Sequence, residues 1–129
     1  MMLTNPQKQS LIERYVQAYN AFDVAEMLQD LHSKIVFKNI ANGEVNLELT
    51  GIEAFEAQAQ QAKALFAERQ QTITQVDFGE DTVTVQIAYQ GVLAQDLPNG
   101  LKAGEKIKLN GRSVFKFQEG KIIEIQDIS

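Results

Sequence analysis

The sequence predicts a single α+β domain in which three N-terminal helices pack on a strongly curved antiparallel sheet. Two periodicities support this fold class. Apolar residues recur mainly at helical spacing up to about residue 68, and at every second position from residue 70 onward. Helices followed by a run of strands are typical of α+β domains. We interpret all 129 residues as one domain, because the chain shows no repeat, linker or low-complexity segment.

Capping residues and apolar stripes predict the first two helices. Asn5 caps the first helix and Pro6 takes its first position. A second, shorter helix begins at Asp23, which forms a capping-box pair with Glu26. The apolar stripe of the first helix comprises Leu11, Ile12, Tyr15, Val16, Tyr19 and Phe22.

A short strand and a third helix follow. The strand is expected at residues 35–37, and residues 41–49, which contain Asn42-Gly43, indicate a turn or loose hairpin. Thr50 and Glu53 have the spacing of another capping box, so a third helix is expected to run to about Glu68. Its buried face would comprise Ile52, Phe55, Ala59, Ala62 and Phe66.

Strands fill the rest of the chain. They are expected at residues 72–78, at 83–93 and, after a loop over 95–104, as two strands within 105–129 that turn at Glu119-Gly120. Gly91 and Gly111 fall at inward positions, where glycine marks a bulge or a bend. A sheet bent at these points forms a cone with an apolar interior and room for a ligand.

Asp127 is the strongest pointer to chemistry. Alternation places it on the same face as Ile123 and Ile125, and on the preceding strand the same face carries Ile107, Leu109, Ser113, Phe115 and Phe117. A carboxyl among such residues is desolvated, which raises its pKa and suits removal of a proton next to a carbonyl. The alternative is a solvated carboxylate on a fraying terminal strand.

Four stretches carry a family resemblance. They are residues 11–23, residues 27–37, the Gly51-Ile52-Glu53-Ala54 helix start within residues 49–55, and the Gly120-Lys121-Ile122 hairpin within residues 114–122. In this order they resemble the NTF2-like superfamily, especially its SnoaL-like and ketosteroid-isomerase-like branch. The resemblance implies an NTF2-like, or cystatin-like, cone with a pocket at its open end and commonly a homodimer. Members include isomerases, cyclases, hydratases, dehydratases and proteins without known catalysis.

The resemblance also suggests roles for particular residues. SnoaL-like cyclases place an acidic general acid/base on a late strand, where this chain has Asp127. The ketosteroid-isomerase branch places a catalytic aspartate near the position of Asn39, and asparagine cannot act as a base. Asn39 is therefore interpreted as a hydrogen-bond donor to a ligand or as a turn residue.

Aromatic and hydroxyl side chains complete the candidate site. Tyr19 and Tyr89 are candidate catalytic donors to an oxyanion, with a place in the core as the alternative. His32, the only histidine, is interpreted either as a general base or as a helix-end residue that contacts terminal carbonyls. The candidate ligand-binding residues are Tyr15, Phe37, Asn39, Phe55, Ser113 and Phe115.

Composition narrows the function classes. A net charge of −5 argues against a nucleic-acid binder. No apolar run reaches membrane-spanning length, and no basic segment precedes an apolar run at the start, so we expect a cytoplasmic protein. The chain has no cysteine and no cofactor motif, so neither a metal site nor a cofactor is expected. The expected ligand is a small apolar molecule.

Three hypotheses remain: a cofactor-independent isomerase or cyclase, a non-catalytic pocket, and a dimerisation or interaction module. A homodimer is expected, because Ile122 and Ile128 point away from the face of Ile123 and would need cover. The same outer face carries the basic row of Lys102, Lys106, Lys108, Arg112 and Lys116.

Overall fold

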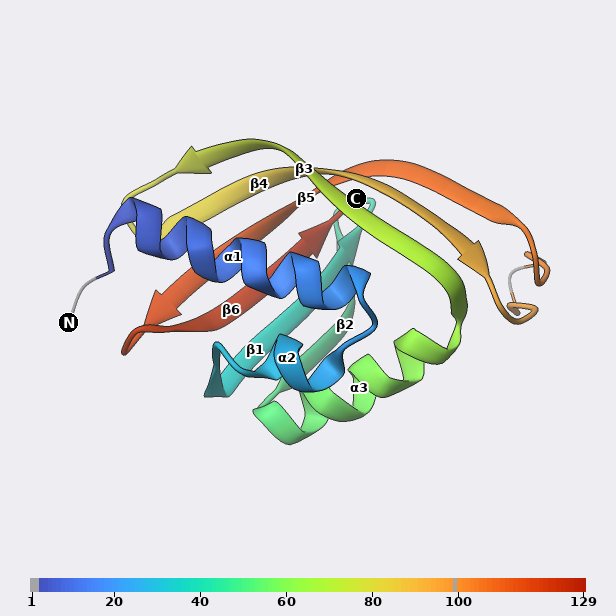
Figure 1. Cartoon of the computed structure of the whole chain (residues 1–129), viewed down its shortest axis with the longest axis horizontal. Helices are drawn as coiled ribbons and strands as arrows, with labels where there is room; N and C mark the ends of the chain where they lie inside the picture. The colour runs from blue at the N-terminus through green and yellow to red at the C-terminus, as the bar shows by residue number, and fades with distance from the viewer. Residues whose placement is uncertain (1–2, 99) are drawn as a thin grey trace.

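Three helices lie on one face of a curved six-stranded sheet in the computed structural model, which describes residues 3–98 and 100–129 (Figure 1). The strand order is β2-β1-β6-β5-β4-β3. The helices are α1 (Asn5–Asn20), α2 (Val24–Leu28) and α3 (Ile52–Ala64). The strands are β1 (Leu31–Ala41), β2 (Glu44–Thr50), β3 (Phe66–Phe78), β4 (Thr82–Leu93), β5 (Lys106–Gln118) and β6 (Lys121–Ile128). The expected α+β cone is confirmed. Among the described residues, no helix is long and apolar enough to cross a membrane.

Helix α1 begins one residue earlier than expected. Thr4, and not Asn5, is the N-cap: its hydroxyl accepts a hydrogen bond from the Gln7 amide at 3.3 Å, and the Gln7 side chain accepts one from the Thr4 amide at 2.9 Å. This reciprocal pair satisfies two amide donors that Asn5 alone would have left to solvent. The predicted cap at Asp23 is confirmed, since its carboxylate accepts from the Glu26 amide at 3.1 Å.

Helix α3 is shorter than expected and lacks the expected cap. Gly51 occupies the N-cap position with φ 96°, and no side chain caps the helix, so the predicted box of Thr50 and Glu53 is wrong. The helix ends at Ala64, and Phe66 already begins β3. Pairing of β3 with β4, from Phe66 opposite Leu93 onward, overrides the helical propensity of this segment.

One strand pair departs from the antiparallel expectation. β1 is antiparallel to β2, as the Asn42-Gly43 turn requires, but it runs parallel to β6. β1 also covers 11 residues, where the sequence predicted only residues 35–37. The parallel pair places Asn39 beside Asp127 in the sheet, so the first and last strands meet at the candidate site.

A register shift in the β5–β6 pair corrects the orientation of two isoleucines. The register slips between Lys116 and Phe117, which pair with Glu124 and Ile122 respectively. Ile122 and Ile125 are therefore both fully buried, and it is Ile122, not Ile123, that joins the core. The expectation that Ile122 lies on the outer face is wrong.

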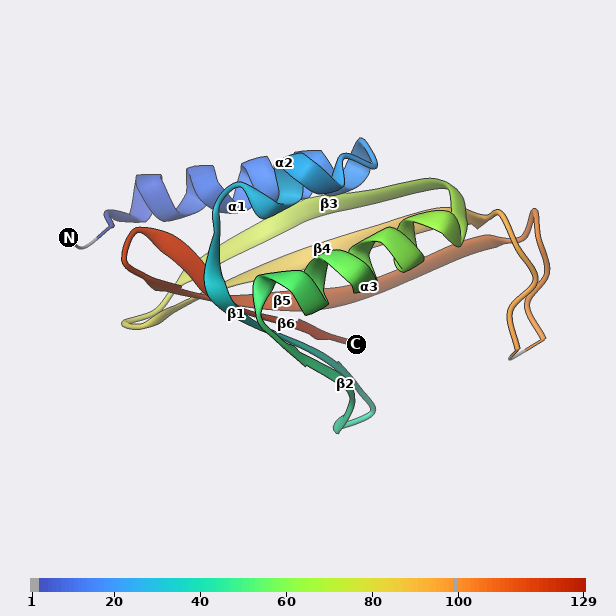
Figure 2. The same cartoon turned by 90° about the horizontal axis from the view of Figure 1, so that it is seen from below.

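The sheet curves beneath the helices and encloses an aromatic core (Figures 1 and 2). A Cβ atom on Gly111 would lie 2.7 Å from the carbonyl oxygen of Ile128, so only glycine permits this close approach of β5 and β6. Inside the curve, the Tyr15 ring packs edge-on against Phe115, with centroids 6.1 Å apart, and tilted against Phe55 at 6.4 Å. The curvature leaves a hollow beyond these rings.

Candidate functional site

An open cavity of about 310 Å³ lies between the inner face of the sheet and the end of α1. Leu109, one of its lining residues, is 45% exposed, which places an opening to solvent at that point. The cavity is lined by Tyr19, Asn39, Phe66, Gln71, Ile87, Tyr89, Ile107, Leu109, Gly111, Arg112, Ser113, Asp127, Ile128 and Ser129. The lining combines apolar side chains with polar groups, as small-molecule sites commonly do.

Asp127 lies at one end of this cavity, which we call the inner end. Its strand β6 is flanked by β5 and β1, so that Ser113 and Asn39 are its direct neighbours across the sheet. The Ser113 hydroxyl donates a hydrogen bond of 2.7 Å to Asp127 Oδ1. The residue as a whole is half-buried at the border of the cavity, and its carboxyl lies deep within the protein.

This enclosure changes the acidity of Asp127. Burial raises the pKa of its carboxyl to about 6, against the opposing effect of the Ser113 hydrogen bond, which favours the ionised form. The group is therefore mostly ionised at neutral pH, yet far more basic than an ordinary aspartate. Among the described residues, Oδ2 makes no hydrogen bond, so it remains available to a ligand proton.

Tyr19 and Tyr89 face each other at the other end of the cavity. Their hydroxyl oxygens are 3.0 Å apart, and their rings meet edge to face with centroids 6.3 Å apart. Burial is the main cause that raises the pKa of both hydroxyls, so both keep their protons at neutral pH. One hydroxyl donates to the other, which leaves one O–H group to donate to a ligand.

The two ends of the cavity are separated along the sheet. Tyr89 pairs with Leu109 on β5, and Ser113, the neighbour of Asp127, lies four residues farther along the same strand. At about 3.3 Å per residue, the backbone positions of Leu109 and Ser113 are about 13 Å apart. Asp127 raises the pKa of Tyr15 but is not among the groups that affect Tyr19 or Tyr89. Only an elongated ligand can contact both Asp127 and the tyrosine pair.

Arg69 supports the tyrosine pair, and sequence reasoning missed it. Its guanidinium carbon lies 3.7 Å from the centroid of the Tyr19 ring, and its Nε donates to the Tyr19 carbonyl at 2.9 Å. Its charge lowers the pKa of both tyrosines, against the stronger effect of burial. The alternation of β3, extended back from Ile73, would have placed Arg69 and Gln71 on the inner face.

The other predicted ligand residues divide into two groups. Asn39 and Ser113 border the cavity, and the Asn39 amide donates to Asn46 Oδ1 at 2.9 Å. The aromatic core holds the remaining four, Tyr15, Phe37, Phe55 and Phe115, which are not among the lining residues. Phe37 packs edge-on against Phe55 with centroids 5.7 Å apart, so this group forms the wall behind the cavity.

His32 lies away from the cavity, on β1. Its Nδ1 accepts a hydrogen bond from the Lys34 amide at 3.0 Å, which assigns the proton to Nε2, and Nε2 lies 2.9 Å from Glu119 Oε1. The histidine thus ties β1 to the turn between β5 and β6 and does not cap a helix end. Residues 3–98 and 100–129 contain no group of three or more side chains arranged to hold a metal ion.

Comparisons with known proteins agree with this fold. A family model described as SnoaL-like domain matches residues 12–125. A search of curated protein sequences gives no significant match. Many solved structures share the fold at low sequence identity.

Three of these structures illustrate the likeness. A proposed polyketide cyclase from Xanthomonas campestris pv. campestris is 20% identical, with a TM-score of 0.81 over 96% of this chain and 90% of that one. A proposed SnoaL-like polyketide cyclase from Jannaschia sp. CCS1 is 15% identical, with a TM-score of 0.79 over 98% and 89%. A Catenulispora acidiphila protein with a ketosteroid isomerase-like fold, in complex with trimethylamine, is 16% identical, with a TM-score of 0.74 over 91% and 82%. At these identities the likeness establishes the fold.

Proposed function

The chain belongs to the SnoaL-like domain family, and we propose that it binds a small, mainly apolar molecule in the central cavity and catalyses cofactor-independent proton transfer on it. The observation that carries this proposal is the Asp127 carboxyl, which borders the cavity and has a pKa raised to about 6. A general base with a pKa near the working pH is largely ionised and is still basic enough to accept a proton from carbon.

The cavity suits an elongated carbonyl compound, such as a conjugated polycyclic ketone. Asp127 Oδ2 would take a proton from carbon at the inner end, and the electron pair of that C–H bond would delocalise through the conjugated system to the carbonyl oxygen. Of Tyr19 and Tyr89, the one whose hydroxyl does not donate to the other would donate a hydrogen bond to that oxygen at the far end. Return of the proton from Asp127 to another carbon would complete an isomerisation. In a cyclisation the carbanion would attack a second carbonyl carbon, the π electrons of that carbonyl would move to its oxygen, and the proton on Asp127 would pass to the resulting alkoxide.

Exchange of carbon-bound hydrogen with solvent tests the proposal without knowledge of the natural substrate. Bicyclic and polycyclic enolisable ketones would be incubated with the protein in D₂O, and deuterium incorporation followed by NMR. We expect the protein to accelerate incorporation, and Asp127→Asn to reduce the acceleration by about 10²-fold or more, as loss of a general base does. Asp77→Asn, which changes an exposed carboxylate of β3 in the same way, should leave the rate unchanged. Equal acceleration by both variants would contradict catalysis by Asp127.

Non-catalytic binding is the second candidate, and one observation favours it. Asn39 stands where the ketosteroid-isomerase branch has its aspartate, and its amide is already bonded to Asn46. A binding protein would shift the cavity resonances in an NMR ligand titration while exchange stays at the uncatalysed rate. A catalyst would show both effects.

We propose in addition that two copies pair through the outer face of the sheet. Val36, Ile40, Val114 and Ile128 have outward register there and are half-buried within one chain, although Ile122 no longer contributes to this face. We expect light scattering to report a dimer at micromolar concentration and Val114→Lys to shift it to monomer. Gln17→Lys on the exposed side of α1 serves as the control. A monomeric wild-type protein would refute the pairing.

A further inference from the structure

The guanidinium group of Arg69 is buried without a counter-ion. The residue is 5% exposed, and its guanidinium carbon lies 3.7 Å from the centroid of the Tyr19 ring and 4.5 Å from that of Phe22. These ring contacts stabilise a cation but do not use the N–H groups at its edge. Within the described residues, Nε alone finds an acceptor, the Tyr19 carbonyl.

The two terminal nitrogens of Arg69 lack protein partners in the part of the chain that the structure describes. Nη2 is buried and makes no hydrogen bond, and no carboxylate forms an ion pair with the group. A guanidinium keeps its charge throughout the pH range in which proteins fold, and a buried charge without partners is costly. The Nη1–Nη2 edge is also the one that can hold a planar oxyanion through two parallel hydrogen bonds.

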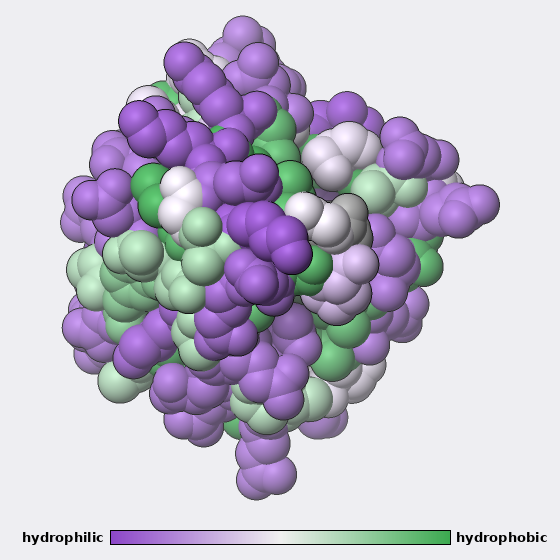
Figure 3. Space-filling view, turned by 90° about the vertical axis from the view of Figure 1, so that its right-hand side faces the viewer, coloured by the Kyte–Doolittle hydropathy of each residue, from purple (hydrophilic) through white to green (hydrophobic). Residues whose placement is uncertain are grey.

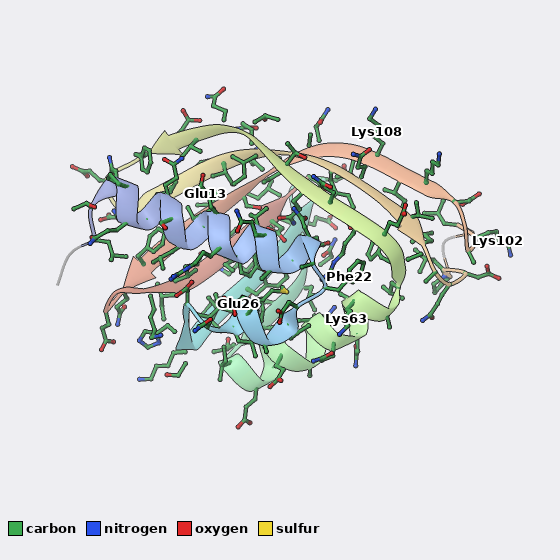
Figure 4. The ribbon with its side chains drawn as sticks, viewed as in Figure 1. Glu13, Phe22, Glu26, Lys63, Lys102 and Lys108 are labelled. Carbon is green, nitrogen blue, oxygen red and sulfur yellow. The ribbon has the colours of Figure 1, made fainter. Side chains whose placement is uncertain are left out.

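A hollow of about 700 Å³ adjoins this side chain. Its lining includes Asn20, Phe22, Arg69, Gly91, Lys106 and Lys108. The register puts the two lysines on the outer face of the sheet and Arg69 on the inner face, so residues of both faces line the hollow. In Figure 4, Lys108 points away from the helices, whereas Phe22 lies on the helix side.

The charge of the lining residues and the backbone conformation of Phe22 both indicate a ligand site at this hollow. Arg69, Lys106 and Lys108 line the hollow with one acidic residue, Glu68, although the chain as a whole carries a net charge of −5. Phe22, which covers the guanidinium, adopts φ 59°, a left-handed conformation that is rare for a bulky residue. Strain of this kind persists where the surroundings enforce it, often at ligand sites. Figure 3 views the nearby end of the molecule, where hydrophilic side chains predominate around scattered apolar patches.

We propose that this hollow is a second binding site, distinct from the central cavity, which takes the oxyanion of a small molecule, a carboxylate or a phosphate, on the terminal nitrogens of Arg69. Lys106 and Lys108 face the other side of the sheet, so they attract the anion over a distance and do not chelate it. The terminal N–H groups of Arg69 supply the affinity for the anion, because charge-assisted hydrogen bonds are stronger where water is excluded.

The experiment uses the full chain and two probes, inorganic phosphate and acetate, each titrated at constant ionic strength against chloride. We expect at least one probe to shift the Arg69 Nε–Hε NMR resonance saturably at millimolar concentration and to raise Tm. Phosphate alone would assign the site to phosphate esters, acetate alone to carboxylates, and both to oxyanions in general. Each of these outcomes supports the site.

Matched variants separate binding from general screening. Arg69→Met keeps the packing volume and removes the charge, so it should fold and lose the effect of the anion on Tm. The pair Lys106→Gln with Lys108→Gln should weaken binding severalfold, whereas Lys38→Gln with Lys102→Gln, which also removes two positive charges, should not. Asp127→Asn should bind the probes normally, because the proposal does not depend on the chemistry of the cavity. A linear, unsaturable shift at Arg69, or equal weakening by both lysine pairs, would overturn it.

Discussion

Ser113 and Asp127 are direct partners across the β5–β6 pair, and the Ser113 hydroxyl donates to Asp127 Oδ1 at 2.7 Å. This bond fixes one oxygen of the carboxylate and leaves the other to the cavity. It also opposes the effect of burial on the pKa of Asp127, which still rises to about 6. The reactivity proposed for Asp127 therefore depends on a balance that single substitutions can shift.

Ser113→Ala should raise the pKa of Asp127 above that of the wild-type protein. The substitution removes the donor that stabilises the ionised carboxylate, while the enclosure by protein atoms remains. The side-chain carboxyl carbon would be titrated by NMR and assigned by its loss in Asp127→Asn. A wild-type value near the ordinary value of about 3.9 would show instead that the carboxyl is solvated.

Asp127 should make the folded state less stable as pH rises. Because its folded pKa of about 6 exceeds the ordinary value of about 3.9, the folded state holds this proton more tightly than the unfolded state does. Its contribution to the free energy of unfolding therefore falls between about pH 4 and pH 7, by about 1–3 kcal/mol.

Urea unfolding of the wild-type protein and of Asp127→Asn at the two ends of that window measures this contribution. The advantage of the asparagine variant should be larger at the higher pH, because only the wild-type protein must bury a charge there. Asp77→Asn provides the control for loss of an exposed carboxylate. A pH-independent difference between wild type and Asp127→Asn would contradict the raised pKa.

Tyr19 and Tyr89 should be energetically coupled. Their hydroxyl oxygens lie 3.0 Å apart, so Tyr19→Phe and Tyr89→Phe each remove the same hydrogen bond. In a double-mutant cycle we expect a coupling of about 1 kcal/mol in the free energy of unfolding. Both variants keep an aromatic ring at position 19 on which Arg69 can stack, so the cycle measures only the interaction between the two hydroxyls. Additive single effects would mean that the hydroxyls do not bond each other in solution.

The sequence was sufficient for the fold class and for the inward position of Asp127, because both rest on alternation and order along the chain. The period of two placed Ser113, Phe115, Ile125 and Asp127 on one face, and the structure puts all four inside. The same alternation predicted the wrong face for Ile122. The register of β5 and β6 shifts by one residue there, and such a shift moves side chains to the opposite face of the sheet.

The remainder of the site depends on long-range contacts that carry no local pattern. The parallel pairing of β1 with β6 brings Asn39 beside Asp127, although most of the sequence separates the two residues. Arg69 lies in a segment whose local residues favour a helix, and only pairing with β4 makes it a strand with an inward-facing side chain. Neither strand pairing follows from local propensity, although alternation places Arg69 on the inner face once its segment is known to be a strand.

Gly111→Ala should distort the inner end of the cavity. A Cβ atom there would lie 2.7 Å from the Ile128 carbonyl oxygen, a backbone atom that can yield only if the end of β6 moves. We expect a loss of about 1–3 kcal/mol in the free energy of unfolding, as for overpacking elsewhere, with shifted amide resonances around Asp127. Asn110→Ala, one residue away with outward register, is the control. Wild-type stability of Gly111→Ala would show that the two strands are farther apart.

His32 should hold its proton on Nε2 and lower the pKa of Glu119. The Lys34 amide occupies Nδ1, so the Nε2–H group donates to Glu119, and this hydrogen bond is the largest cause of the lowered pKa, ahead of the one from Gln118. His32→Gln should raise the pKa of the Glu119 carboxyl toward its ordinary value, and Gln118→Ala should raise it less. Carbon-detected NMR titration of Glu119 measures both, and nitrogen chemical shifts of the ring report the tautomer. If the Nδ1 tautomer predominates, the bond to the Lys34 amide cannot form, and the tie between β1 and the β5–β6 turn must rest on other contacts.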